Sequence, residues 1–223
     1  MILIPATHDD WRHRVSESTT VHTSSAPAQM ADRWQAAAGF PAEIARLFST
    51  ARATRSAALL VAIPHHQVPL AGGAHAAHLD LWALVRTGRG LLSVAIDAVG
   101  AEAFDAEADD RTATTESRRL WKGLCRLLEI HESADTPVSS QLVHRTTTAL
   151  VEAKRFFARG AAVVVHSFGE SRRGFSDFQQ FVRLMGGALV EPGQLVEVQP
   201  REGVELYFGW AQAPHIRAQP SGA

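Results

Sequence analysis

Residues 78–99 read HLDLWALVRTGRGLLSVAIDAV, and this stretch decides the fold that we expect. Two apolar runs flank the Gly-containing segment TGRG at 87–90, which predicts a β-hairpin with strands over 79–86 and 90–98. Successive side chains of a strand point to opposite faces, so the register of this hairpin determines which side chains meet.

Two aspartates occupy matching positions on the expected strands. If the turn is centred between its second and third residues, Asp80 faces Asp97 with about 5 Å between their Cβ atoms. Like charges placed opposite each other repel, so a chain that keeps them often holds a cation, a shared proton or a substrate between them. The other interpretation is a register slip of one residue, which separates the two side chains and leaves both solvated at strand ends.

The acid pair leads to a cofactor prediction. We expect Asp80 and Asp97 to act as catalytic acids or as ligands of a divalent metal, with His78, or alternatively His75, as a nitrogen ligand. This mixed set of ligands suits Mg, Mn, Fe or Zn, and we expect no other cofactor. No compact metal motif such as HExxH accompanies these residues, so ordinary loop histidines are the alternative interpretation.

Length and composition predict a single domain over 1–223. The chain has 223 residues, of which 46% are hydrophobic, enough for one well-buried core. The net charge of −1 does not favour broad binding to a nucleic-acid backbone, although a local basic patch leaves nucleic acid open as a partner. The single cysteine, Cys125, excludes a disulfide framework. No apolar stretch is long enough to cross a membrane, so we expect a cytoplasmic protein without a membrane partner, and leave a homo-oligomer open.

The pattern of apolar residues predicts an α/β fold in which a mixed central sheet is flanked by helices. Besides the hairpin, helices are expected between Ser25 and Gly39, from Pro41 to Phe48, and over 115–129, 140–157 and 176–185, and strands over 59–63, 161–165, 188–190, 194–198 and 204–210. The remaining segments are an irregular N-terminal segment at 1–26, a loop at 64–77, a helical insertion at 99–138 and a loose tail at 214–223.

The order of a helix, three strands, a helix and a strand resembles the core of the restriction-endonuclease-like, PD-(D/E)xK, superfamily. Short stretches also resemble a bacterial branch of that superfamily whose activity is not established: Trp34…Gly39-Phe40-Pro41, Val68-Pro69-Leu70…Gly72-Gly73, Asp80-Leu81, Gln141-Leu142-Val143-His144-Arg145-Thr146, Ala149-Leu150-Val151-Glu152-Ala153, His166-Ser167-Phe168 and Leu206-Tyr207-Phe208-Gly209-Trp210. The resemblance implies an acid on the second core strand and an acid–any residue–lysine motif near the end of the third. In that superfamily the acids hold Mg²⁺ or Mn²⁺, and the lysine helps to activate water.

The chain departs from this pattern at the lysine. The branch tends to read Glu-Gly-Lys where this chain reads Asp97-Ala98-Val99, and valine cannot donate a proton, carry charge or orient water. The branch also tends to carry Glu and Lys near two positions where this chain has His65 and Gln67. Several ionisable positions therefore differ around one expected pocket, which indicates a degenerate active site whose chemistry has changed or been lost.

The expected long helix carries candidate substrate-binding residues. Gln141, Arg145 and Glu152 follow each other at spacings that place them on one helix face. We expect them to bind substrate near the hairpin, where the helix N-terminal half also favours an anion. His144 beside them is a candidate proton carrier near neutral pH. The alternative interpretation is a solvated helix face.

Two further candidates follow the buried strand at 161–165. Ligands gather at the carboxyl ends of parallel strands in open α/β sheets, so we expect His166 to be catalytic and Ser167 to bind substrate. A capped helix start is the alternative interpretation of the serine.

These features leave three functions open. We favour an enzyme that acts on a small molecule in the acidic pocket, which is also the candidate metal site. The net charge near zero, the loss of the lysine and the added histidines nearby favour this function. The first alternative is a metal-dependent nuclease or phosphodiesterase without the usual lysine, since two aspartates can hold a cation that generates hydroxide. The second alternative is a catalytically inactive binding module.

Overall fold

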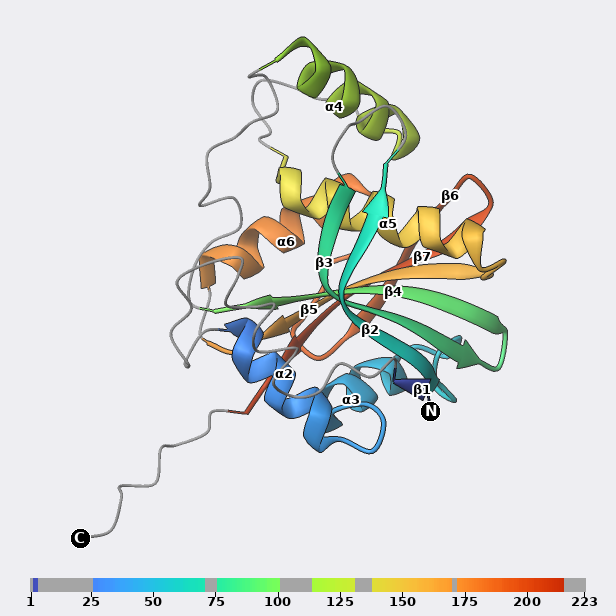
Figure 1. The fold of residues 1–223 in the computed structure, drawn as a ribbon, viewed down its shortest axis with the longest axis vertical. Coiled ribbons are helices and arrows are strands. Elements are labelled where there is room, and N and C mark those ends of the chain that lie inside the picture. Colours follow the sequence, from blue (N-terminus) through green and yellow to red (C-terminus); the bar gives the residue numbers. More distant parts are fainter. Residues whose placement is uncertain are drawn as a thin grey trace, which may run out of the picture.

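The computed structural model describes residues 2–3, 26–70, 76–100, 114–130, 138–169 and 172–214. Its strands are β1 (Ile2–Leu3), β2 (Ala58–Pro69), β3 (Ala76–Thr87), β4 (Gly90–Val99), β5 (Gly160–Ser167), β6 (Leu195–Arg201) and β7 (Val204–Gln212). Its helices are α2 (Ala26–Ala36), α3 (Ala42–Thr50), α4 (Thr115–Leu127), α5 (Ser140–Arg155) and α6 (Arg172–Leu184). Figure 1 shows α4, α5 and α6 on one side of the sheet and α2 and α3 on the other.

The strands form one mixed sheet in the order β1-β2-β3-β4-β5-β7-β6. Strands β2, β3 and β4 are antiparallel neighbours, whereas β4, β5 and β7 run parallel to one another. The last strand in the order, β6, is antiparallel to β7. The predicted α/β fold, with a mixed central sheet flanked by helices, is therefore confirmed.

The hydrophobic core lies in two layers, one on each face of the sheet. The strand β5 is buried at every position because helices cover both of its faces. Successive residues of this strand lie alternately in the two layers. Ala161, Val163 and Val165 pack on the α5 side, while Ala162 and Val164 pack on the side of α2 and α3. The apolar run that predicted this strand reflects that burial.

The hairpin has the register that the sequence predicts. The paired residues run from Thr87–Gly90 at the turn to Leu81–Ile96, without a slip. The ladder ends at Leu81–Ile96, although β3 itself continues back to Ala76. The two strands therefore separate at the level of the two aspartates.

The second strand is much longer than predicted. A loop was expected at 64–77, but β2 continues through Pro64 to Pro69, and β3 already begins at Ala76. The prolines led to the loop prediction, because a proline has no N–H to donate to a neighbouring strand and is therefore rare in central strands. On its outer side, however, β2 pairs with a described strand only at Val61 and Ala62, so from Ile63 onward it lies at the border of the described sheet, where prolines are tolerated.

Two expectations near the C-terminal half are wrong. The segment 188–190 is not a strand; the carbonyl of Val190 instead accepts a hydrogen bond of 2.8 Å from the side chain of Gln179. The helix expected from Ser176 begins at Arg172, because Phe175 extends its apolar face by packing edge-on against Trp210. Ser176 therefore lies inside the helix and does not cap it.

The predictions for the N-terminal segment and for the insertion can be compared with the structure only where their residues are described. The segment predicted to be irregular at 1–26 contains β1 and the first residue of α2. The insertion predicted at 99–138 contains α4 as expected. Residues 4–25, 101–113, 131–137 and the tail from 215 lie outside the described residues.

The helix α5 is fixed at both ends by backbone and capping contacts. A serine caps its start: Ser139 Oγ accepts a hydrogen bond from the N–H of Leu142 at 3.3 Å. At its end, Phe157 adopts a φ of 52°, and the N–H of Ala158 donates to the carbonyl of Ala153 at 2.7 Å. This closing loop is of the Schellman type, in which the left-handed position is usually a glycine.

Candidate functional site

The candidate site lies where β3 and β4 separate. Beyond the pair Leu81–Ile96, the carboxylate of Asp80 fills the opening and accepts a hydrogen bond of 2.9 Å from the N–H of Ala98. The side chain thus satisfies a backbone donor that the ladder no longer reaches. Asp80 is half-buried, so it is held by the fold while retaining access to solvent.

Asp97 is buried beside it and is paired with an arginine from α5. Its exposed fraction is 4%, and its Oδ2 accepts a hydrogen bond from Nε of Arg145. The same guanidinium donates through Nη1 to the backbone carbonyl of His78 on β3. Arg145 therefore joins the two separating strands to the helix. The second carboxylate oxygen of Asp97, Oδ1, is buried and has no hydrogen-bond partner among the described residues.

The two acids interact electrostatically, as the predicted register requires. Burial, and next the negative charge of Asp97, raise the pKa of Asp80 from 3.8 to about 7, against the opposite influence of Arg145 and of the Ala98 N–H. A carboxyl group with this pKa changes its proton near neutral pH, which an ordinary aspartate does not do. The arrangement can therefore hold or move a proton at Asp80.

The position of the missing lysine is apolar. Val99 is 8% exposed and belongs to the core layer beneath α5. The positive charge near the two acids comes instead from Arg145, in the second turn of α5. The resemblance placed that charge on the strand, so the sequence pattern around Val99 could not locate it.

The predicted metal ligands do not form a metal site. Arg145 occupies one oxygen of Asp97, the Ala98 N–H occupies one oxygen of Asp80, and the residue His78 is exposed. Within the described ranges, no group of three or more His, Cys, Asp or Glu side chains could hold a metal ion. A guanidinium repels a cation from this position, so the residues present do not fit a bound divalent metal.

The predicted substrate-binding face of α5 is buried against the sheet and is not a solvated face. Glu152 has an exposed fraction of 0%, and its Oε1 accepts a hydrogen bond of 2.7 Å from Arg155. Its Oε2 lies 3.3 Å from Nε2 of His66 on β2, and the ring of His66 lies tilted at 5.2 Å from that of Trp82. Glu152 therefore belongs to a second polar cluster, two helical turns beyond Arg145.

Two of the other residues predicted on this helix are half-buried. Gln141 lies one turn before Arg145 on the same face, and His144 lies on the adjacent face, about 100° around the helix. The sequence prediction missed His66, because it placed this histidine in a loop. Its apolar neighbours along β2 were the available signal, but Pro64 obscured it.

The structure separates His166 from the two aspartates. His166 is fully buried on the side of α2 and α3, where its Nε2 lies 2.9 Å from Oε1 of Glu43. His166 therefore lies on the opposite face of the sheet from Asp97, which is paired in register with Val165, because alternate residues of β5 point to opposite faces; its catalytic role stays a prediction. Ser167, the next residue, has its Oγ donating to the carbonyl of Gly169 at 3.0 Å.

The His166 pair carries its own electrostatic signature. Burial lowers the pKa of His166 below its ordinary value, although the hydrogen bond and charge of Glu43 oppose this. Burial alone would raise the pKa of Glu43, but the hydrogen bonds from His166 and the backbone and the charges of His166 and Arg33 bring it below its ordinary value. The pair thus favours a neutral imidazole beside a carboxylate that Arg33 also contacts at 3.3 Å.

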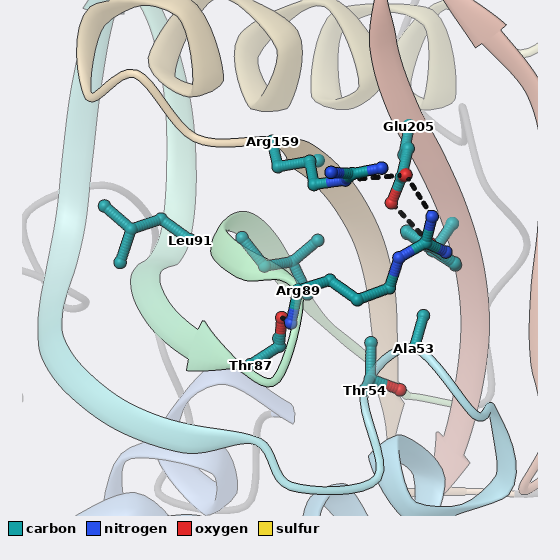
Figure 2. A pocket seen from close by; sticks show the side chains of 10 residues that line it. Ala53, Thr54, Thr87, Arg89, Leu91, Arg159 and Glu205 are labelled. Atoms are coloured by element: carbon teal, nitrogen blue, oxygen red, sulfur yellow. Dashed lines mark hydrogen bonds and ion pairs between the residues drawn. The ribbon is translucent and has the colours of Figure 1, made fainter.

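A separate depression lies at the turn end of the hairpin, and Figure 2 shows its charged residues. Oε1 of Glu205 contacts Arg89 and Arg159 at 2.9 Å each, and its Oε2 accepts a hydrogen bond from Tyr207 at 3.0 Å. Burial opposes ionisation, yet hydrogen bonds from Arg159 and Tyr207 hold the pKa of Glu205 below its ordinary value. The contacts fasten the hairpin to the start of β7, at the opposite end of the sheet from Asp80.

Comparison with known proteins identifies a family but no activity. No curated protein and no solved structure matches this chain. In the part of the chain that the structure describes, no helix has the length and apolar character needed to cross a membrane. One family model matches residues 5–215, nearly the whole sequence. The chain therefore belongs to the family described as Domain of unknown function (DUF6946).

Proposed function

We propose that this protein is an enzyme that transfers a proton to or from a small polar molecule at Asp80. The observation that carries the proposal is the pKa of Asp80, which burial and Asp97 raise to about 7. At neutral pH such a carboxyl group is present in both protonation states, so it can serve as a general acid or a general base. Its half-buried position allows a substrate to reach it.

Arg145 and Asp97 give the reacting group a fixed polar environment. The guanidinium of Arg145, held by Asp97 and by the carbonyl of His78, places a positive charge where negative charge on a substrate is stabilised. The buried Oδ1 of Asp97 has no hydrogen-bond partner in the part of the chain that the structure describes, and it can accept a hydrogen bond from a substrate O–H or N–H group. These features favour a small molecule with such a donor beside the atom that changes its proton.

The element order supports a restriction-endonuclease-like core for this site. The chain runs through α3, the antiparallel strands β2, β3 and β4, then α5 and β5, which is the order that the resemblance implies. The acids lie on β3 and β4, the strands on which the resemblance implies the reactive groups. The proposed chemistry is a departure from the superfamily, because Arg145 replaces a metal cation beside Asp97.

A screen for ligands tests the proposal. Purified protein is heated with members of a library of polar metabolites, and the melting temperature is compared with that of Asp80→Asn and Asp97→Asn variants. We expect at least one compound to stabilise the wild type and to lose that effect in both variants, with a pH dependence centred near 7. If every stabilising compound acts equally on the wild type and the variants, the site does not bind substrate and the proposal is wrong.

A metal-dependent nuclease is the second candidate, and the adjacent pair of Asp80 and Asp97 favours it. It requires Arg145 to leave Asp97 so that a cation can bind. The protein is incubated with single- and double-stranded DNA and RNA in the presence of Mg²⁺ or Mn²⁺. Cleavage that Asp97→Ala abolishes supports the nuclease, whereas no cleavage by wild type or Arg145→Ala protein excludes it.

An inactive binding module is the third candidate, because the ion pair of Arg145 with buried Asp97 can be purely structural. It predicts that substitution of Asp80 or Asp97 leaves the binding of every ligand or partner unchanged.

A cytoplasmic location and a homo-oligomeric state are further proposals. Fractionation of the source cells tests the location, and sedimentation of the purified protein tests the oligomeric state.

A further inference from the structure

A phenylalanine at the end of α5 is exposed and strained at the same time. Phe157 has an exposed fraction of 94%, the highest of the exposed large hydrophobic residues among those described. Its φ of 52° lies in the left-handed region, where a residue with a side chain is disfavoured. The neighbouring Phe156, by contrast, packs against Trp82 with 4.8 Å between the ring centroids.

The side chain of Phe157 contributes nothing to the core that offsets this strain. The left-handed turn itself is closed by backbone hydrogen bonds: the N–H of Phe157 donates to the carbonyl of Lys154 at 3.3 Å, and Ala158 donates to Ala153. Glycine would serve these bonds better. A large apolar side chain kept at such a position is typical of a contact with another molecule.

Charged side chains lie close to this phenylalanine in the chain and at the same end of the sheet. Lys154 contacts Glu202, Arg155 contacts the buried Glu152, and Arg159 shares Glu205 with Arg89 (Figure 2). Three further arginines are exposed at the same end of the sheet: Arg86 beside the hairpin turn, and Arg52 and Arg55 in the adjoining turn. The turns are in contact, since a Cβ on Gly88 would lie 3.2 Å from Oγ of Ser56. We call Phe157 with these basic residues the basic aromatic surface.

The charge of this surface favours an acidic protein segment that carries an aromatic residue. A nucleic-acid backbone requires a continuous positive stripe, whereas Glu202 and Glu205 interrupt this one. A mixed rim of arginines and carboxylates around an aromatic residue is typical of a protein–protein contact. Two basic aromatic surfaces would repel each other, so a symmetric contact of this surface with itself is disfavoured.

The chain itself contains a segment of the required chemistry. Residues 101–110 read AEAFDAEADD, with five acidic residues around Phe104 and no basic residue. This segment follows Gly100 at the end of β4, whereas Arg159 contacts the opposite end of that strand: a Cβ on Gly90 would lie 3.4 Å from its Cβ. We propose that residues 101–110 of a second copy bind to the basic aromatic surface.

The geometry requires the second copy. The ten residues of β4 extend about 33 Å at roughly 3.3 Å per residue. Phe104 is only four residues after Gly100, so chain length alone limits its reach to roughly 14 Å from Gly100. Phe104 of the same copy therefore cannot reach Phe157, and the proposed contact is made between copies.

A peptide-binding experiment on the full chain tests this inference. A labelled peptide of residues 101–113 is titrated with the wild-type protein, Phe157→Gly, and Leu189→Ala as a control for an exposed hydrophobic residue elsewhere. We expect Phe157→Gly to weaken binding about tenfold or more, as loss of an anchoring aromatic residue does, while Leu189→Ala binds like the wild type. A peptide that carries Phe104→Ala should bind the wild-type protein about as weakly as the unaltered peptide binds the Phe157→Gly protein.

Sedimentation of the protein provides the second measurement. The wild type is expected to self-associate with rising concentration at low salt, and Phe157→Gly or an excess of the peptide should suppress this. No peptide binding at about 1 mM peptide, a concentration that detects affinities of only ~4 kcal/mol, overturns the inference. Equal binding by Phe157→Gly overturns it as well.

Two further probes separate other occupants of the surface. If single-stranded oligothymidine or phosphatidylserine vesicles bind in a manner that requires Phe157, and the peptide does not, the surface takes another partner and the inference is wrong. The variants Asp80→Asn and Asp97→Asn should bind the peptide like the wild type. Failure of the proposed enzymatic function and failure of this contact are thus distinguishable.

Discussion

At the level of single residues, the raised pKa of Asp80 has a consequence for folding stability. Its pKa is about 7 in the folded protein, compared with 3.8 as its ordinary value, so the folded chain binds this proton more tightly than the unfolded chain does. The stability contributed by Asp80 is therefore present at low pH and is lost as the pH rises from 3.8 to about 7. We expect the free energy of unfolding to fall by on the order of 2–4 kcal/mol over this range through Asp80.

Urea unfolding at pH 5 and pH 8 measures this effect. The comparison protein is Asp80→Asn, whose side chain keeps the size of aspartate but cannot ionise. The variant should lose less stability between the two pH values than the wild type. An equal pH dependence in both proteins contradicts the raised pKa.

Arg145 gives a second prediction at the residue level. Its removal by Arg145→Ala leaves the buried carboxylate of Asp97 without a charged partner, and we expect a loss of stability of about 2–4 kcal/mol. The pKa of Asp80 should also rise above its wild-type value, because Arg145 is one of the groups that lower it. Carbon-13 NMR of the aspartate carboxyl groups follows the pKa, and denaturant unfolding follows the stability.

The conservative variant provides the control. Arg145→Lys keeps the charge but loses one of the directed donors that reach Asp97 and the carbonyl of His78. It should change the pKa of Asp80 less than Arg145→Ala does. If both variants leave that pKa unchanged, the guanidinium does not govern the site.

At the level of secondary-structure elements, the end of α5 should be more stable with glycine. We expect Phe157→Gly to raise the free energy of unfolding by about 1 kcal/mol, because glycine adopts the left-handed conformation without strain. Phe157→Ala removes the same ring but keeps the strain, so it should give little gain. Thermal unfolding of the two variants and the wild type separates these effects, and an equal gain in both contradicts the role of strain.

The contact of α3 with the sheet depends on a glycine of β7. A Cβ added to Gly209 would lie 2.8 Å from a methyl group of Leu47 and 2.9 Å from one of Leu195. Gly209→Ala therefore forces these buried side chains apart, and we expect a destabilisation of about 1–3 kcal/mol. The matched control is Gly193→Ser, at an exposed turn with open space around the glycine but a left-handed φ of 82°. A larger loss from Gly193→Ser, measured by thermal unfolding, contradicts the packing argument.

At the level of the whole molecule, the sequence predicts those elements whose signal lies in residues close together in the chain. The hairpin register follows from one Gly-containing turn and two apolar runs. The same register predicts that Asp80 and Asp97 form a pair. Each of these depends on residues close together in the chain.

What the sequence could not predict depends on contacts between distant elements. The continuation of β2 through Pro64 is tolerated where that part of the strand lies at the border of the described sheet. The pairing of Arg145 with Asp97 joins residues 48 positions apart, and the face that holds His166 follows from which helices cover β5. No periodicity of the sequence specifies contacts between residues so far apart in the chain. The residues that make up the site can therefore be identified only in the folded sheet.

The prolines of the outer strands have a consequence for the fate of the chain in a crowded cell. Pro64 and Pro69 lie on the part of β2 that pairs on its outer side with no described strand, and Pro200 lies on β6 at the other side of the described sheet. Proline has no backbone N–H to add to a ladder, so prolines near both borders oppose extension of the sheet by another polypeptide. The molecule is thereby protected against the edge-to-edge stacking that begins aggregation, even while its side chains remain available for specific contacts.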